Sequence, residues 1–143
     1  MHFDLHPQLA ADTFIVGDLP LCRVLLMNDS RYPWTILVPR RAGLRELYEL
    51  HEADLQRYWR ESMLLSRALM GAYQGDKLNI AALGNMVPQL HIHHVVRFKT
   101  DAAWPAPVWG KHPALHYTAD ALAQQIALLR SVLAAELTPP ATV

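Results

Sequence analysis

The sequence predicts an α+β fold: a mainly antiparallel sheet with one long central helix and a C-terminal helix. Three observations lead to this class. Short apolar, β-branched runs separated by turn residues fill the N-terminal part of the chain. A helical period then persists over about 52–73. Two further apolar runs follow close together before a final helical pattern, and this order of strands and helices favours an α+β architecture.

The N-terminal part predicts three strands. After a start segment, 1–12, that is partly helical, we expect strands at 13–16, 21–27 and 34–38. The near-continuous hydrophobicity of 21–27 predicts burial on both faces. The six-residue polar loop 28–33 predicts that the second and third strands pair antiparallel.

The rest of the chain predicts two helices, two strands and an irregular loop. A short helix is expected at 44–50, directly before the long one. A strand at 78–83 is separated from the fifth strand by a short loop, so the two should pair as a hairpin. Prolines and tryptophans in 99–116 predict an ordered but irregular loop. Thr118 is a candidate N-cap for a last helix that extends to Leu137.

Length and composition limit the function. The 143 residues suit one domain, and the formal net charge is +0 at pH 7. With no long run of Lys or Arg, nothing indicates a nucleic-acid or membrane-surface partner. The single cysteine, Cys22, cannot form an internal disulfide or a cysteine-based zinc cluster. Neither a signal peptide nor a bilayer-length apolar run is present, so we expect a cytoplasmic protein.

The fifth predicted strand holds three of the eight histidines: His91, His93 and His94. Neighbouring Ile and Val residues favour the pleat. Because side chains alternate along a strand, Gln89, His91 and His93 share one face with Arg97. His94 points to the opposite, mostly apolar face. We interpret the first face as the floor of a site.

Four interpretations of this face are open. The histidines can be satisfied polar residues at a sheet surface, although perturbable groups cluster at functional sites. They can be two ligands of a metal, but the possible third ligands lack diagnostic spacing: His51, His112, His116 and Asp101. A neutral imidazole can attack phosphorus as a nucleophile. Finally, the pocket can bind a nucleotide without turnover.

The nucleophile interpretation needs further donors for the oxygens of a phosphate. Gly84 and Asn85 lie in a small polar loop just upstream of the histidines, and Gln89 adds an amide. Arg97 is either a phosphate contact or an exposed strand end. These residues make the loop and the strand one candidate site.

The sequence resembles the histidine triad (HIT) family, whose signature is His-φ-His-φ-His-φ-φ with φ apolar. On this chain the register runs over 89–95, as Gln-Leu-His-Ile-His-His-Val. Segments 26–28 and 36–40 resemble the paired strands of the family, and Gly84-Asn85 resembles its glycine-amide step. The resemblance covers a motif core of about 14–98 in a single domain, 1–143. The C-terminal loop and helix, 99–143, lie outside that core.

This resemblance implies a HIT-like homodimer that binds nucleotides. It also implies hydrolysis or transfer at a phosphorus bond of nucleoside phosphoramidates or dinucleoside polyphosphates. His91 would be the nucleophile that becomes nucleotidylated, and His93 would contact the phosphate or the leaving group. Asn28 would meet the ribose, and Asn85 with Gly84 would bind phosphate. The mechanism needs no metal and no other cofactor.

Three departures from the family pattern bear on activity. Gln89 takes the place of the first histidine in a Gln-His-His catalytic set, and glutamine can hydrogen-bond but cannot carry a proton. His94 stands where an apolar residue is usual, and we expect it to be structural or edge-exposed. Met86 replaces a small hydroxyl residue. The alternative is therefore a nucleotide-binding module with little or no catalysis. The segment 104–109 resembles a bacterial branch of the family.

Overall fold

The structure is a computed structural model that describes residues 2–141. The α+β architecture predicted from the sequence is confirmed. In chain order, the elements are α1 (Pro7–Asp12), β1 (Thr13–Asp18), β2 (Cys22–Met27), β3 (Trp34–Pro39), the 3-10 turn η1 (Leu47–Glu49), α2 (Glu52–Tyr73), β4 (Lys77–Ala81), β5 (Ile92–Arg97) and α3 (Ala119–Val132). Within residues 2–141, no helix is long and apolar enough to cross a membrane.

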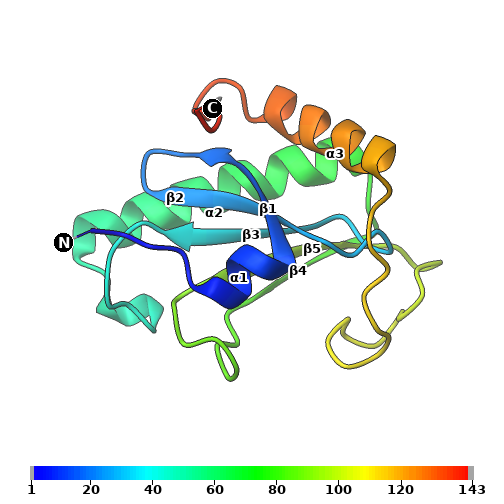
Figure 1. The fold of residues 1–143 in the computed structure, drawn as a ribbon, viewed down its shortest axis with the longest axis horizontal. Helices are drawn as coiled ribbons and strands as arrows, with labels where there is room; N and C mark the ends of the chain where they lie inside the picture. The colour runs from blue at the N-terminus through cyan, green and yellow to red at the C-terminus, as the bar shows by residue number, and fades with distance from the viewer. Residues whose placement is uncertain (1, 142–143) are drawn as a thin grey trace.

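The sheet has five strands in the order β1-β2-β3-β5-β4, and every neighbouring pair is antiparallel (Figure 1). Both predicted pairings, β2 with β3 and β4 with β5, are confirmed. The histidine strand β5 lies inside the sheet, where His93 faces Ile36 of β3 on one side and Ala81 of β4 on the other. Its backbone is therefore fixed from both sides.

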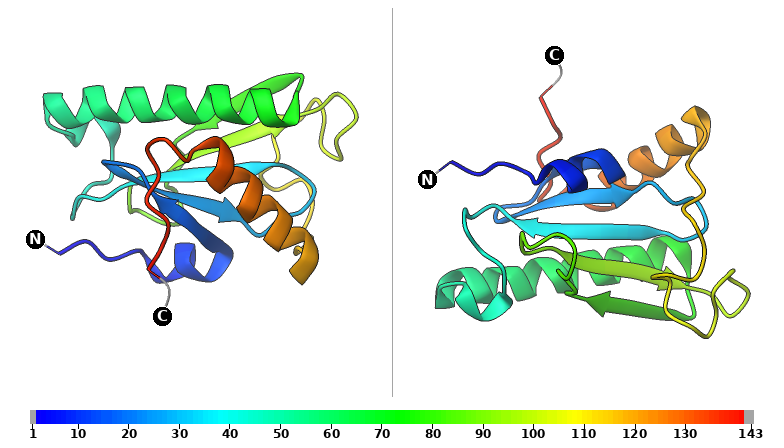
Figure 2. Two further views of the ribbon diagram at one scale, coloured as in Figure 1. Left: turned by 90° about the horizontal axis from the view of Figure 1, so that it is seen from above. Right: turned by 60° about the horizontal axis from the view of Figure 1, so that its bottom comes forward.

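The two faces of the sheet are covered by different parts of the chain (Figure 2). On one face, α2 and α3 pack on the strands through a core that includes Tyr58, Leu65 and Leu129. On the other face, α1 contributes Leu9 to a second core, which the loop between β5 and α3 completes with Val108. Because both faces are covered, β3 is buried throughout and β2 nearly so, as its continuous hydrophobicity predicts.

Two helix predictions differ from the structure. The short helix expected at 44–50 is one 3-10 turn. The last helix begins as predicted, with Thr118 Oγ1 accepting from Ala121 N at 3.2 Å, but it ends at Val132. Beyond it, Thr138 pairs with Asp18 of β1 through two backbone hydrogen bonds of 2.8 Å. Pairing with a strand edge requires extended backbone, so the helical spacing toward residue 137 does not continue as helix.

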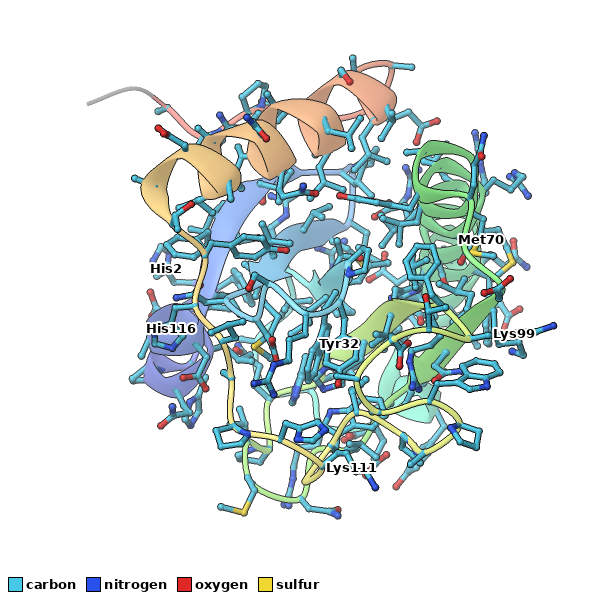
Figure 3. All side chains as sticks on the ribbon, turned by 90° about the vertical axis from the view of Figure 1, so that its right-hand side faces the viewer. His2, Tyr32, Met70, Lys99, Lys111 and His116 are labelled. Carbon is cyan, nitrogen blue, oxygen red and sulfur yellow. The ribbon has the colours of Figure 1, made fainter. Side chains whose placement is uncertain are left out.

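The loop that follows β5 crosses one end of the molecule, from Lys99 past Lys111 to His116 (Figure 3). Arg97 anchors it: the guanidinium donates to both carboxylate oxygens of Asp101, to Asn79 Oδ1 and to the carbonyl of Ala106, at 2.8–3.0 Å. Arg97 is only 1% exposed. It is therefore neither a phosphate contact nor an exposed strand end, the two roles its sequence position suggested.

Candidate functional site

A pocket of about 350 Å³ opens on the side of the sheet that α1 and the loop after β5 cover. Its walls come from α1, the adjoining ends of β2 and β3, the loop between β4 and β5, and the loop after β5: Leu9, Asp12, Met27, Trp34, Leu83, Gly84, Asn85, Met86, Val87 and Trp109. His91 and His93 also line it. A larger hollow of about 470 Å³ lies beside α2, but no histidine, cysteine or serine lines it.

His91 presents one ring nitrogen to the protein. Its Nδ1 lies 2.7 Å from the main-chain carbonyl oxygen of Gln89. A carbonyl can only accept, so Nδ1 must carry the hydrogen in this contact. In the neutral ring, Nε2 then holds a lone pair. His91 is 7% exposed and lines the pocket, and the contact with the Gln89 carbonyl selects the tautomer of its neutral ring.

His93 has the opposite tautomer. The indole Nε1 of Trp34 donates to its Nδ1 at 2.9 Å, and an indole N–H can only donate. The hydrogen of neutral His93 is therefore on Nε2. Burial, helped by the neighbouring His91 and His94, lowers the pKa of His93 to about 3. At neutral pH this ring is an uncharged hydrogen-bond donor.

Aromatic rings hold His93 in place. The His91 and His93 ring centroids are 5.0 Å apart, and those of Trp109 and Trp34 lie 5.1 Å and 5.7 Å from His93. Trp109 Nε1 is buried and has no hydrogen-bond partner within residues 2–141. Trp109 lines the pocket. Trp104 instead stacks its ring on the Arg97 guanidinium.

His94 lies on the other face of β5, as the alternation predicts. Its Nε2 pairs with the hydroxyl of Ser62 in α2 at 2.8 Å, and its Nδ1 with the carbonyl of Ile92 at 3.1 Å. The side chain is fully buried, and burial lowers its pKa to about 4. The edge-exposed alternative is wrong: His94 has a structural position.

The other predicted site residues divide into two groups. Gly84, with a left-handed φ of +70°, and Asn85 line the pocket beside the histidines. Asn28 does not line it, and its Oδ1 accepts from the backbone N–H of Tyr117 at 3.0 Å. Gln89 also lies outside the wall, and its side-chain amide is bonded to the N-terminal segment.

Two contributions to the site do not follow from the sequence. Trp34 reaches His93 only because β3 pairs with β5 in a particular register, across 59 positions of chain. Leu9 and Asp12 reach the pocket because α1 folds back over the sheet. Alternation along β3 places Trp34 on the same face as Ile36, and this was the one sequence signal that Trp34 lies on the pocket side.

The described part of the chain provides no ligand set for a metal ion. No three His, Cys, Asp or Glu side chains of residues 2–141 form a group that could hold a metal ion. Of the third ligands considered, Asp101 is taken by Arg97, and His112 Nε2 lies 3.2 Å from the carbonyl of Ala102.

Comparison with known proteins places this geometry in a family. A model of the HIT domain matches residues 8–100. A histidine triad protein from Marinobacter aquaeolei is 53% identical, with 95% of this chain and 99% of that chain covered and a TM-score of 0.93. Similar proteins from Bradyrhizobium japonicum (46% identity, 92% and 98% covered, TM-score 0.90) and Sinorhizobium meliloti (40%, 92% and 97%, 0.89) also match. No curated protein matches the chain.

Proposed function

Because this chain belongs to the histidine triad (HIT) family, we propose that it binds a nucleotide in the pocket and cleaves a phosphorus bond through a covalent intermediate on His91. One observation carries the proposal. The 2.7 Å contact between His91 Nδ1 and the carbonyl of Gln89 leaves Nε2 as the unprotonated nitrogen of a ring that lines the pocket. An unprotonated imidazole nitrogen is the form that attacks phosphorus.

In the first step, the Nε2 lone pair forms a bond to phosphorus. The bond from phosphorus to the leaving group breaks, and its electron pair goes to the leaving group, which takes a proton from water. His91 then carries phosphorus on Nε2 and hydrogen on Nδ1, so the ring is cationic. The Gln89 carbonyl stabilises this charge by accepting from Nδ1. In the second step, water attacks phosphorus and loses a proton. The bond from phosphorus to Nε2 breaks, and its electron pair returns to Nε2.

His93 supports the reaction as a hydrogen-bond donor. Its Nδ1 already accepts from Trp34, so Nε2–H is the hydrogen available to a phosphate oxygen. A neutral imidazole is too weak an acid to protonate a leaving group, and a pKa of about 3 keeps His93 neutral. We therefore assign it to charge stabilisation in the transition state. Gly84 and Asn85, which line the pocket, would add donors from the loop. The ribose contact that the resemblance implies for Asn28 is not part of the proposal, because Asn28 lies outside the wall.

The charge of the wall bears on the leaving group. Among residues 2–141, Asp12 is the only Asp, Glu, Lys or Arg that lines the pocket. A dinucleoside polyphosphate would bring several negative charges to a wall without Lys or Arg. A nucleoside phosphoramidate brings fewer, and its leaving group departs as a neutral amine once it has taken a proton. The phosphoramidate is therefore the favoured substrate of the two.

The alternative is a nucleotide-binding module without appreciable turnover. Two features favour it. Gln89 replaces a titratable histidine, and its side-chain amide is bonded to the N-terminal segment and not to the pocket. Met86, which is 93% exposed, offers no hydroxyl near the phosphate. Under this alternative the same pocket holds a nucleoside monophosphate, and His91 Nε2 only accepts a hydrogen bond.

Assays with an adenosine phosphoramidate and a diadenosine polyphosphate separate the two functions. We expect release of AMP from the phosphoramidate, with a higher kcat/KM than for the polyphosphate. The matched measurement is AMP affinity by calorimetry. If the protein binds AMP but releases it from neither substrate, the binding module is the correct function. If it shows no AMP affinity and no AMP release, both functions are refuted.

We also propose that two copies pair through α2 and the edge strand β4. Both elements expose apolar side chains: Trp59 is 49% exposed, Met63 37% and Ile80 42%. The outer edge of β4 has unpaired backbone groups, which a second copy can cover. Light scattering should give twice the chain mass, and Trp59→Glu should reduce it to the monomer mass.

A further inference from the structure

The N-terminal segment is tied to the site by one side chain. The Nε2 of Gln89 donates to the carbonyl of Asp4, and its Oε1 accepts from the backbone N–H of His6, both at 2.8 Å. The amide therefore pairs with two backbone groups of one extended stretch, as a neighbouring strand would. These bonds join positions 83 and 85 residues apart, so they do not follow from local structure.

The same residue also holds the reactive ring. While its side chain binds the N-terminal segment, the main-chain carbonyl of Gln89 accepts from His91 Nδ1 at 2.7 Å. One residue thus links the segment to His91. A displacement of the Gln89 side chain acts on the segment alone, since the carbonyl remains in every variant at this position.

The fastened segment leads directly into a wall of the pocket. His6 is the N-cap of α1, with its Nδ1 accepting from Gln8 N at 3.0 Å. Two residues of α1, Leu9 and Asp12, line the pocket. A helix of six residues is not stable on its own. The position of α1 therefore depends on its contacts with the rest of the protein: the packing of Leu9 in the second core, the junction with β1 at one end, and Gln89 at the other.

Glutamine suits this task better than the histidine that the family motif has at this place. A primary amide presents its donor and its acceptor side by side on one carbon, matching the Asp4 carbonyl and the His6 N–H. The two nitrogens of an imidazole point in different directions, and a protonated imidazole has no acceptor. The substitution at position 89 thus exchanges a titratable group for one that pairs with backbone.

We propose that Gln89 is a positioning residue: its side-chain amide fastens residues 4–6 so that α1 closes the wall of the nucleotide pocket beside His91. The proposal deepens the proposed function and rests on it for the effect on catalysis. Its structural half, the attachment of the segment, is measurable without any substrate.

Hydrogen exchange of the full-length protein tests the attachment. Gln89→Leu removes both hydrogen bonds, and Gln89→Glu keeps the acceptor but loses the donor to Asp4. For Gln89→Leu we expect the backbone amides of 8–12 to exchange on the order of tenfold faster, and for Gln89→Glu less, while amides of α2 are unchanged. Unchanged exchange at 8–12 in Gln89→Leu would overturn the proposal.

A matched pair at position 6 isolates one hydrogen bond. His6→Pro removes the N–H that Gln89 accepts, and the φ of −54° at His6 suits proline. His6→Ala loses the same imidazole cap but keeps the N–H. We expect exchange at 8–12 to be several-fold faster in His6→Pro than in His6→Ala, and this ratio to fall to about one when both carry Gln89→Leu. A ratio that persists without Gln89 would contradict the attachment.

Kinetics test the positioning role. Because α1 forms the wall and not the nucleophile, Gln89→Leu should raise KM for the phosphoramidate and weaken AMP binding on the order of tenfold, with kcat changed less. Faster exchange at 8–12 with wild-type KM and AMP affinity would refute the role in the site. Failure of the proposed function is a separate result. If the wild-type protein shows no turnover, comparing the AMP affinities of wild type and Gln89→Leu still tests the role of Gln89.

Discussion

His93 and His94 are neighbours on one strand, and they differ in what their ring nitrogens contact. Both are buried, and burial lowers the pKa of both, to about 3 and about 4. On the helix side, both nitrogens of His94 are engaged, by Ser62 and by the carbonyl of Ile92. On the pocket side, His93 and His91 each have Nδ1 engaged by the protein, and neither Nε2 has a hydrogen-bond partner within residues 2–141. Availability of a nitrogen, more than burial, separates the site from the core.

The largest expected effect is the loss of turnover when the Nε2 of His91 is removed, compared with removal of the Nε2 of His94 on the opposite face. In His91→Asn the amide replaces Nδ1–H toward Gln89 but has no counterpart of Nε2. We expect its turnover of phosphoramidate to fall at least about 10⁴-fold with AMP affinity retained. His94→Asn, the matched variant, should keep turnover per folded molecule within a few-fold and lose stability in urea. Comparable losses of turnover in both variants would abolish the distinction between the two faces.

Acid should destabilise both faces alike. His93 and His94 have folded pKa values of about 3 and 4, below the ordinary value of 6.5, so the unfolded chain binds more protons. Their contribution is complete above pH 6.5 and is lost as pH falls toward those values. From about pH 7.5 to about pH 5, the free energy of unfolding should fall by about 2 kcal/mol for each ring.

Urea unfolding at the two pH values measures this change. His94→Asn should show about half the wild-type pH dependence, because one of the two rings is gone. A wild-type curve that is flat over this range would mean that the rings are not buried as neutral groups.

The next effect concerns the partner of His94. Ser62→Ala leaves the Nε2 of a fully buried ring without its hydrogen-bond donor, at a cost of about 1–3 kcal/mol in the free energy of unfolding. Ser66→Ala, one turn later, removes only a bond to a helix carbonyl and should cost less. Both variants should keep kcat. A fall in kcat for Ser62→Ala alone would connect the helix face to catalysis.

The smallest effect concerns the partner of His93. Trp34→Phe keeps an aromatic ring but loses the N–H that fixes the His93 tautomer, so we expect kcat/KM to fall by up to about tenfold. Trp109→Phe is the matched control, because Trp109 packs on the same ring without donating to it. An equal or larger loss in Trp109→Phe would show that ring packing, and not the hydrogen bond, matters for His93.

The sequence predicts the strand side of this site well and its surroundings poorly. Alternation along β5 is a local property, so it correctly separates His93 from His94, and His91, directly before the strand, lies on the same side as His93. The bond from Trp34 to His93 depends on strand register across 59 positions. The amide of Gln89 meets a segment 83–85 positions away. Such contacts are decided by how the elements pack, which periodicity does not encode.

Arg97 shows the same limit. Alternation correctly puts it on the same face as His93, but its guanidinium donates to Asp101 and Ala106 of the loop that follows β5 and to Asn79 of β4. The sequence predicts the face of the strand on which Arg97 lies, but not the residues that accept its hydrogen bonds. Asp101 lies only four positions away, and even this pair requires the turn after β5 to be known.

We propose that His91 Nε2, and neither His93 nor His94, forms the bond to phosphorus. Acid-free rapid quenching of the protein with an adenosine phosphoramidate, followed by intact-mass and peptide mass spectrometry, tests it most directly. We expect a transient increase by the mass of one adenylyl group, located on His91 and absent in His91→Asn. Turnover without such an adduct, or an adduct on His93 or His94, would rule out His91 as the nucleophile.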